Sequence, residues 1–183
     1  VGGGWGDQGS GPAGGPDGTA FATGLTWCKA TGLRTGIGVG PGSGRPAAFN
    51  ADHARRVWEE TKGTFVLGVG SGQMAHAVEG MRAYLGELRS RLPPGLPIYV
   101  AALGPRLLPL AGEIAGGVAA NWCTPSQGAG SRSVAGVRRG AAAGGKGAWG
   151  MLAKGQSSGN DSAGMARARR WGSNSLPSSR FFS

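Results

Sequence analysis

The chain has few of the residues on which metal-centred or disulfide-stabilised proteins depend. It contains two cysteines and two histidines in 183 residues. Cys28 and Cys123 lie far apart and neither has a CxxC partner, which argues against a disulfide framework or a zinc site and favours a reducing compartment. No apolar run reaches the roughly 18 residues needed to cross a bilayer, and the first residues lack the basic-then-apolar order of a signal peptide. These absences predict a cytoplasmic protein.

Glycine and proline, in contrast, are abundant. With 39 glycines and 11 prolines, over a quarter of the 183 residues are conformationally loose or helix-breaking. The formal net charge is +10, and it is unevenly distributed: residues 126–183 carry nine Lys or Arg and the single acid Asp161, whereas residues 21–125 carry ten Lys or Arg and six acids. Most of the excess positive charge therefore lies in the C-terminal segment.

That basic segment allows one alternative function. Arg167, Arg169 and Arg170 precede Trp171, and such a cluster would suit loose binding of nucleic acid, in which cations meet phosphates and aromatic rings stack on bases. A solvated low-complexity tail is the favoured interpretation, because residues 126–183 contain only six Leu, Ile, Val or Phe. A basic Arg/Gly-tailed nucleic-acid-binding protein without enzymatic activity is thus the alternative to an enzyme.

Shifts in composition divide the chain into three segments. Residues 1–20 form a glycine-rich leader and residues 126–183 a basic Gly/Ala/Ser/Arg-rich tail, and both are predicted to be disordered. Residues 21–125 alternate between the patterns of buried strands and amphipathic helices. The predicted strands are 33–39, 64–69, 98–102 and 118–122, and the predicted helices are 47–62, 75–91 and 106–115, after an earlier helix that ends at Gly32.

The pattern is organised around residues 64–69 and the Gly70-Ser71-Gly72 turn that follows them. The apolar run is typical of a strand buried on both faces, and the glycines let the backbone pass close to a ligand or turn sharply into a helix. Strand-helix repeats of about thirty residues indicate a parallel sheet. Both the doubly wound dinucleotide-binding sheet and the (β/α)8 barrel fit, because Gly70, Gly72 and Ala75 satisfy only a loose G-x-G-x-x-A motif.

Three segments resemble a known family: LRTGIGVGP (33–41), GTFVLGVGSGQ (63–73) and PIYVAALGPRLLPLAGEIAGGVAANWCTP (97–125). Residues 25–125 resemble the middle of the luciferase-like monooxygenase family, the flavin- or deazaflavin-dependent oxidoreductases. The resemblance implies an α/β fold in which the matched strands are the third to sixth of a TIM-type barrel. It also implies FMN or a deazaflavin coenzyme at the carboxyl ends of these strands, together with a small organic substrate.

The resemblance further implies which residues contact the cofactor. They lie at three strand ends: Val39, Gly40 and Pro41; Gly68, Gly70 and Ser71; and Ala102, Leu103, Gly104 and Arg106. In the family the first group lies with an irregular backbone against the isoalloxazine ring, the second lines the same pocket, and the third binds the cofactor phosphate. Physical chemistry agrees with the third assignment, because free N–H groups at a helix N-terminus attract phosphate and an arginine adds a charge-assisted bond. The alternative is that these glycines only turn strands into helices.

Candidates for proton transfer are few. His76 follows the 64–69 strand on the side of a barrel where chemistry occurs, and it is the catalytic candidate. His53 lies in the preceding helix, where a packing or surface role is favoured. In this family the flavin performs the redox chemistry and the protein positions it. No metal site is predicted.

Two departures from the family pattern limit the match. The family usually carries an acid in an AxDG turn, where this chain has Ala115-Gly116-Gly117. The first two and last two strands of the barrel have no counterpart among the patterned residues, and a closed barrel takes about 250 residues. We therefore expect an incomplete barrel of about four parallel strands, which is a truncated oxidoreductase or an inactive fragment. Its open sheet edges would invite self-association.

Overall fold

The computed structural model describes residues 3–4, 9–11, 18–102, 104–121, 131–145, 148–154 and 169–172. Its strands are β1 (Gly3–Gly4), β2 (Gly9–Gly11), β3 (Arg34–Pro41), β4 (Phe65–Gly70), β5 (Ile98–Ala101), β6 (Gly117–Asn121), β7 (Ala148–Lys154) and β8 (Arg169–Gly172). Its helices are α1 (Thr19–Thr31), α2 (Ala47–Glu60), α3 (Ala77–Arg91), α4 (Leu107–Ile114) and α6 (Ser131–Ala143). The part with strands β3 to β6 follows the alternation that the sequence predicts.

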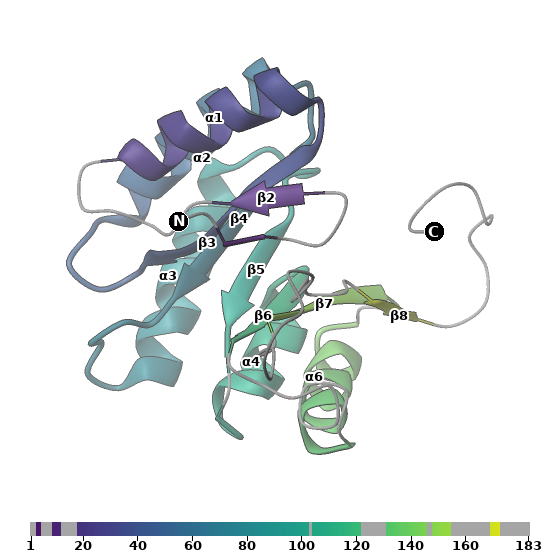
Figure 1. The fold of residues 1–183 in the computed structure, drawn as a ribbon. Coiled ribbons are helices and arrows are strands. Elements are labelled where there is room, and N and C mark those ends of the chain that lie inside the picture. Colours follow the sequence, from purple (N-terminus) through teal and green to yellow (C-terminus); the bar gives the residue numbers. More distant parts are fainter. Residues whose placement is uncertain are drawn as a thin grey trace, which may run out of the picture.

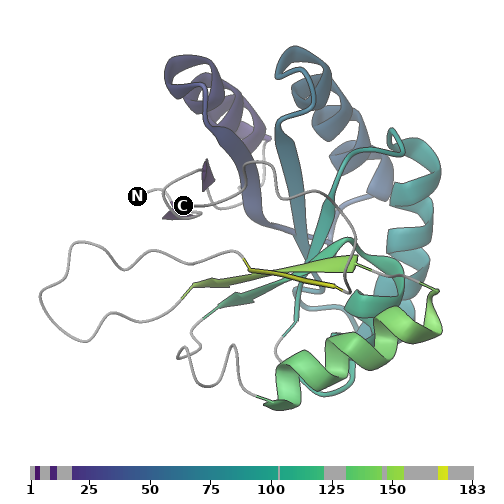
Figure 2. The same ribbon diagram turned by 90° about the vertical axis from the view of Figure 1, so that its right-hand side faces the viewer.

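The strands form one sheet in sequence order from β1 to β8. Neighbours from β2 to β7 pair in parallel, and β1 and β8 pair antiparallel at the two edges. The helices form an arc on one side of the sheet (Figure 1, Figure 2). The fold is an incomplete α/β barrel, as expected from the sequence, and no pairing among the described strands joins the two edges.

Strand β4 lies in the middle of the sheet, and all six of its residues are buried. Phe65, Leu67 and Val69 belong to the hydrophobic layer between the sheet and the helices. Gly68 and Gly70 alternate with them and lie on the opposite face, because successive residues of a strand point to opposite sides. On the helices, large and fully buried side chains of this layer are Met81, Leu85, Leu88 and Leu110. The prediction of a strand buried on both faces is confirmed.

Glycines with left-handed backbone lie at the end of α1 and shortly after the end of α2. Gly32 has a φ of 69° and donates its N–H to the carbonyl of Cys28 at 2.8 Å, which closes α1. Gly63, with a φ of 83°, lies between α2 and β4. Glycine adopts these angles without the steric cost that a Cβ would impose. Both helix ends therefore lie close to where the sequence predicts them.

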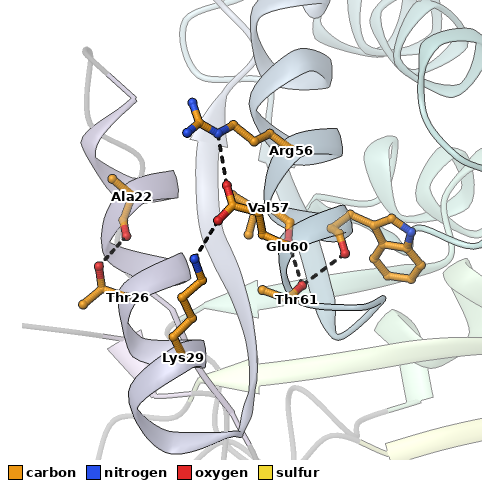
Figure 3. Close-up of polar contacts among 8 residues, drawn as sticks. Ala22, Thr26, Lys29, Arg56, Val57, Glu60 and Thr61 are labelled. Atoms are coloured by element: carbon orange, nitrogen blue, oxygen red, sulfur yellow. Dashed lines mark hydrogen bonds and ion pairs between the residues drawn. The ribbon is translucent and has the colours of Figure 1, made fainter.

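A surface network joins α1 to α2 at the end of the sheet where the strands begin (Figure 3). Glu60 accepts hydrogen bonds from Lys29 Nζ at 2.7 Å and from Arg56 Nε at 3.1 Å. The Lys29 ammonium and then the Arg56 guanidinium lower the pKa of the Glu60 carboxyl. Thr61 donates its hydroxyl to the carbonyl of Val57 at 2.7 Å. These contacts lie away from the carboxyl ends of the strands.

Helix α6 is the main difference from the expected organisation, because it lies within the segment for which composition predicts no buried face. It packs on α4, and its Val137 and Ala141 are buried. Cβ atoms built on its Gly140, or on Gly144 directly after the helix, would overlap backbone carbonyls of α4, so the two helices are in close contact. Counting large aliphatic residues misses such a face, because the buried surface is mostly backbone and small side chains. Strands β1, β2, β7 and β8 also lie in the two tails predicted to be disordered, and β2 and β7 pair with β3 and β6, so β3 and β6 are not sheet edges. Most other residues of the two tails lie outside the described residues.

Candidate functional site

The carboxyl ends of β3, β4 and β5 align with the middle of β6 in a row of small residues. Pairing brings Pro41 of β3 opposite Gly70 of β4, Gly70 opposite Ala101 of β5, and Ala101 opposite Ala119 of β6. In a complete (β/α)8 barrel, bulky branched side chains dominate the interior, and active sites lie at this end of the strands. The row therefore lies where an active site is expected, and its side chains are smaller than those usual in a barrel interior.

The end of β3 has an irregular backbone, as the resemblance implies. Its register with β4 shifts between Ile37 and Gly40, and the peptide bond between Gly38 and Val39 is cis. The methyl groups of Val39 lie 2.9 Å and 3.3 Å from Cβ positions built on Gly68 and Gly70. The structure thus brings Val39, Gly68 and Gly70 together on the face opposite to the helix layer. Side chains at the two glycines would compete for the space beside Val39.

Two loops that follow β3 and β4 are joined by hydrogen bonds. Gly42 donates its N–H to the carbonyl of Gly70 at 2.7 Å, and Gln73 donates its N–H to Ser43 Oγ at 3.0 Å. Ser71, a predicted site residue, lies half-buried at the start of the second loop. The two strand ends predicted to contact the cofactor are therefore held to one another by backbone donors.

A polar pair lies behind the end of β3, between the sheet and the helices. Asn50 of α2 donates from Nδ2 to the hydroxyl of Tyr84 on α3 at 2.6 Å. Both side chains are buried, and a Cβ built on Gly40 would lie 3.8 Å from Asn50 Nδ2 and from Asn50 Oδ1. Burial raises the pKa of Tyr84, and the hydrogen bond from Asn50 and the charge of Arg45 partly offset that effect.

The third predicted group lies at the end of β5 and the start of α4. Ala102 is buried, Gly104 is exposed and accepts the N–H of Leu108 at 3.2 Å, and Leu103 lies outside the described residues. The side chain of Arg106 is 79% exposed, and its Nη2 lies 3.8 Å from Glu79 Oε1 of α3. The guanidinium is thus free to reach an external anion, at the expense of a weak ion pair.

The two histidines have different surroundings. His76 is exposed on the loop between β4 and α3, at the carboxyl-end side of the sheet, with a φ of 50°. His53 is packed between the rings of Phe21 and Phe49, with centroid distances of 5.2 Å and 4.2 Å. The packing role predicted for His53 is confirmed, and His76 lies on the side of the fold where a catalytic role would place it.

Asn50, Tyr84 and Glu79 also lie near the predicted site and were not predicted from the sequence. Asn50 carries a detectable signal, because it interrupts the alanine face of α2 made by Ala47, Ala51 and Ala54. A polar residue at an inward position of an amphipathic helix requires a buried partner. The partner on α3 could not be identified from that pattern alone.

No protein-family model and no curated protein sequence matches the chain. Among solved structures, it is similar to the coenzyme F420-dependent tetrahydromethanopterin reductase from Methanopyrus kandleri, with a TM-score of 0.53 and 18% identity over 67% of this chain and 49% of that one. It is also similar to an F420-dependent secondary alcohol dehydrogenase in complex with an F420-acetone adduct, with a TM-score of 0.56 and 13% identity over 67% of this chain and 50% of that one. The chain spans about half the length of each. At these identities the likeness establishes the fold.

Proposed function

We propose that this chain forms the cofactor-binding half of a deazaflavin-dependent oxidoreductase of luciferase-like type, which acts on a small organic substrate. The observation that carries the proposal is the row of small residues across β3 to β6, next to the irregular end of β3. Two solved structures with the same fold bear names that state F420 dependence, which favours a deazaflavin over FMN. The alternative of a basic nucleic-acid-binding protein gains no support from the fold.

The shape of this surface fits a planar ring system. A tricyclic ring needs a flat face that few side chains interrupt, and Gly70, Ala101 and Ala119 supply such a face beside the methyl groups of Val39. A Cβ on Gly70 would lie 3.4 Å from the Cβ of Ala101, so neighbouring strands already fill the sheet to ordinary contact. A ligand ring would therefore lie on top of the row rather than between the strands.

The start of α4 fits the phosphate of such a cofactor. No described atom lies within 4 Å of a Cβ built on Gly104, so the backbone there is approachable. At the N-terminus of α4 the N–H of Leu108 is bonded to the carbonyl of Gly104 and Pro109 has no N–H, so the N–H groups of Arg106 and Leu107 would meet a phosphate, together with the positive end of the helix dipole. Arg106 precedes α4 and supplies an exposed cation.

The mechanism divides the work between cofactor and protein. A bound deazaflavin would supply hydride transfer, which no side chain can perform. Val39 and the end of β3 would support one face of the ring and fix the side from which a substrate approaches. The N-terminus of α4 and Arg106 would hold the phosphate end, and the imidazole of His76 would give or take a proton at the substrate.

A binding titration tests the proposal. The purified full chain is titrated with F420 and, in parallel, with FMN, and binding is followed by cofactor fluorescence. We expect saturable binding of F420 and weaker binding of FMN. Ala101→Leu should abolish binding, because it places a branched side chain within the row. Ala83→Leu, an equal change at an exposed position on α3, should leave binding intact. A folded chain that binds neither cofactor at about 1 mM, a limit of roughly 4 kcal/mol, would contradict the proposal.

A further inference from the structure

The hydrogen bond between Asn50 and Tyr84 is an unusual feature of the layer between sheet and helices. Around it the layer is apolar, with Ala47, Ala51 and Leu85 all buried. Burying an amide and a phenol hydroxyl is costly unless they are paired, and removing one partner leaves the other unsatisfied. Apolar residues of similar shape would fill this layer without that risk. The polar pair therefore calls for an explanation beyond packing.

The position of the Asn50–Tyr84 pair relative to β3 provides such an explanation. The two amide atoms of Asn50, Oδ1 and Nδ2, are both 3.8 Å from a Cβ position built on Gly40, so the amide group lies beside this residue, with room for one methyl group there. Gly40 is the first residue paired with β4 after the register shift. At this point the regular ladder is interrupted, and neighbouring strands alone determine the backbone less firmly.

The hydrogen bond fixes which way the amide faces. Asn50 belongs to α2, and Tyr84 belongs to α3, so the 2.6 Å contact ties together the helices that follow β3 and β4. With Nδ2 committed to the tyrosine oxygen, the side chain of Asn50 has one orientation against Gly40. Buried polar pairs are known to restrict a core to one arrangement in some proteins.

We propose that Asn50, oriented by Tyr84, is a positioning residue that fixes the irregular end of β3 as a support for the cofactor ring. The cofactor part of this statement rests on the function proposed above. The part that concerns β3 concerns the free protein and can be tested without any ligand. A role in stability alone predicts a different outcome in the experiment below.

The first test is amide hydrogen exchange of the full chain without ligand. Tyr84→Phe removes the acceptor and leaves the Asn50 amide unpaired, which should lower Tm by about 2–12 °C. We expect exchange of Gly38, Val39, Gly40 and Gly42 to accelerate at least about tenfold more than exchange in β5. Leu88→Met, a volume-conserving change one turn further along α3, is the matched control and should not produce this local effect.

The second test separates positioning from stability. In the double variant Asn50→Leu/Tyr84→Phe, both polar groups are replaced by apolar groups, so Tm should recover most of the loss. Exchange at the end of β3 should nevertheless stay fast, and F420 affinity should stay at least about tenfold lower than in the wild type. Recovery of protection together with Tm, or acceleration spread evenly over β3 to β5, would overturn the proposal. A wild type that does not bind F420 would instead count against the proposed function, while the exchange result still decides the role of Asn50.

Discussion

The packing of α6 on α4 predicts opposite effects on stability for two glycine-to-alanine substitutions, one in α6 and one in α3. A Cβ on Gly140 would overlap the carbonyl oxygen of Pro109 and lie 2.8 Å from its Cα, so Gly140→Ala forces the helices apart. Gly86 lies in α3, and no described atom is within 4 Å of a Cβ built there. In a helix interior, alanine is favoured over glycine by about 1 kcal/mol when nothing else changes. We expect Gly86→Ala to stabilise the protein and Gly140→Ala to destabilise it.

The size of the effect at Gly140 follows from the contact. Overpacking a well-filled interface costs about 1–3 kcal/mol. If the two helices move apart by about 1 Å, Val137, which is buried in the same interface, also loses up to half of the dispersion energy of its contacts. Burial of a valine contributes about 1.5–3 kcal/mol, so this loss is about 1 kcal/mol. After subtracting the propensity gain, Gly140→Ala should cost about 1–3 kcal/mol and lower Tm by roughly 2–12 °C.

Thermal and urea unfolding followed by circular dichroism measure both variants. Gly86→Ala should raise Tm by about 1–4 °C, which reflects propensity alone. If Gly140→Ala raised Tm to the same extent, Gly140 would behave as an exposed helical position. That result would refute the close packing of α6, and with it the inclusion of residues 131–143 in the folded unit.

Three further predictions concern the site. Gly68→Ala should destabilise the chain by about 1–3 kcal/mol, because its Cβ would overlap a carbonyl of β3, whereas Gly40→Ala has room and should fold normally in the same unfolding assay. Glu79→Gln should strengthen F420 binding up to about fivefold at low salt and less at high salt, because it frees Arg106 from an exposed ion pair. Burial raises the pKa of Tyr84, so the neutral phenol stabilises the fold below pH 10.0, and this contribution is lost as the pH rises further. Tyr84→Phe should therefore flatten the alkaline limb of a stability-against-pH curve, and an unchanged limb would contradict this assignment.

The elements from β3 to β6 could be predicted because their signals are local. An uninterrupted apolar run such as 65–67 requires cover on both faces, and a glycine such as Gly32 permits the left-handed backbone that ends a helix. The partner of Asn50 could not be predicted, because the signal in α2 shows that a buried partner is needed and not where it is. Helix α6 was missed for another reason: its buried face is made by glycine and alanine, and composition treats these residues as signs of disorder.

The glycines of β4 show most clearly where sequence reasoning ends. Gly68 and Gly70 are two residues apart, lie on the same face and belong to the same resemblance, yet a side chain would meet different surroundings at each. At Gly68 it would overlap the carbonyl of Ile37, so glycine is required for two strands to approach. At Gly70 a Cβ would lie 3.3 Å from Val39 Cγ2 and 3.4 Å from the Cβ of Ala101, so a small side chain would need only a small shift of Val39. A glycine that the protein's own packing requires less strictly is better evidence for a ligand than one that packing alone explains. Among the predicted cofactor contacts, Gly70 therefore supports a bound ring more strongly than Gly68.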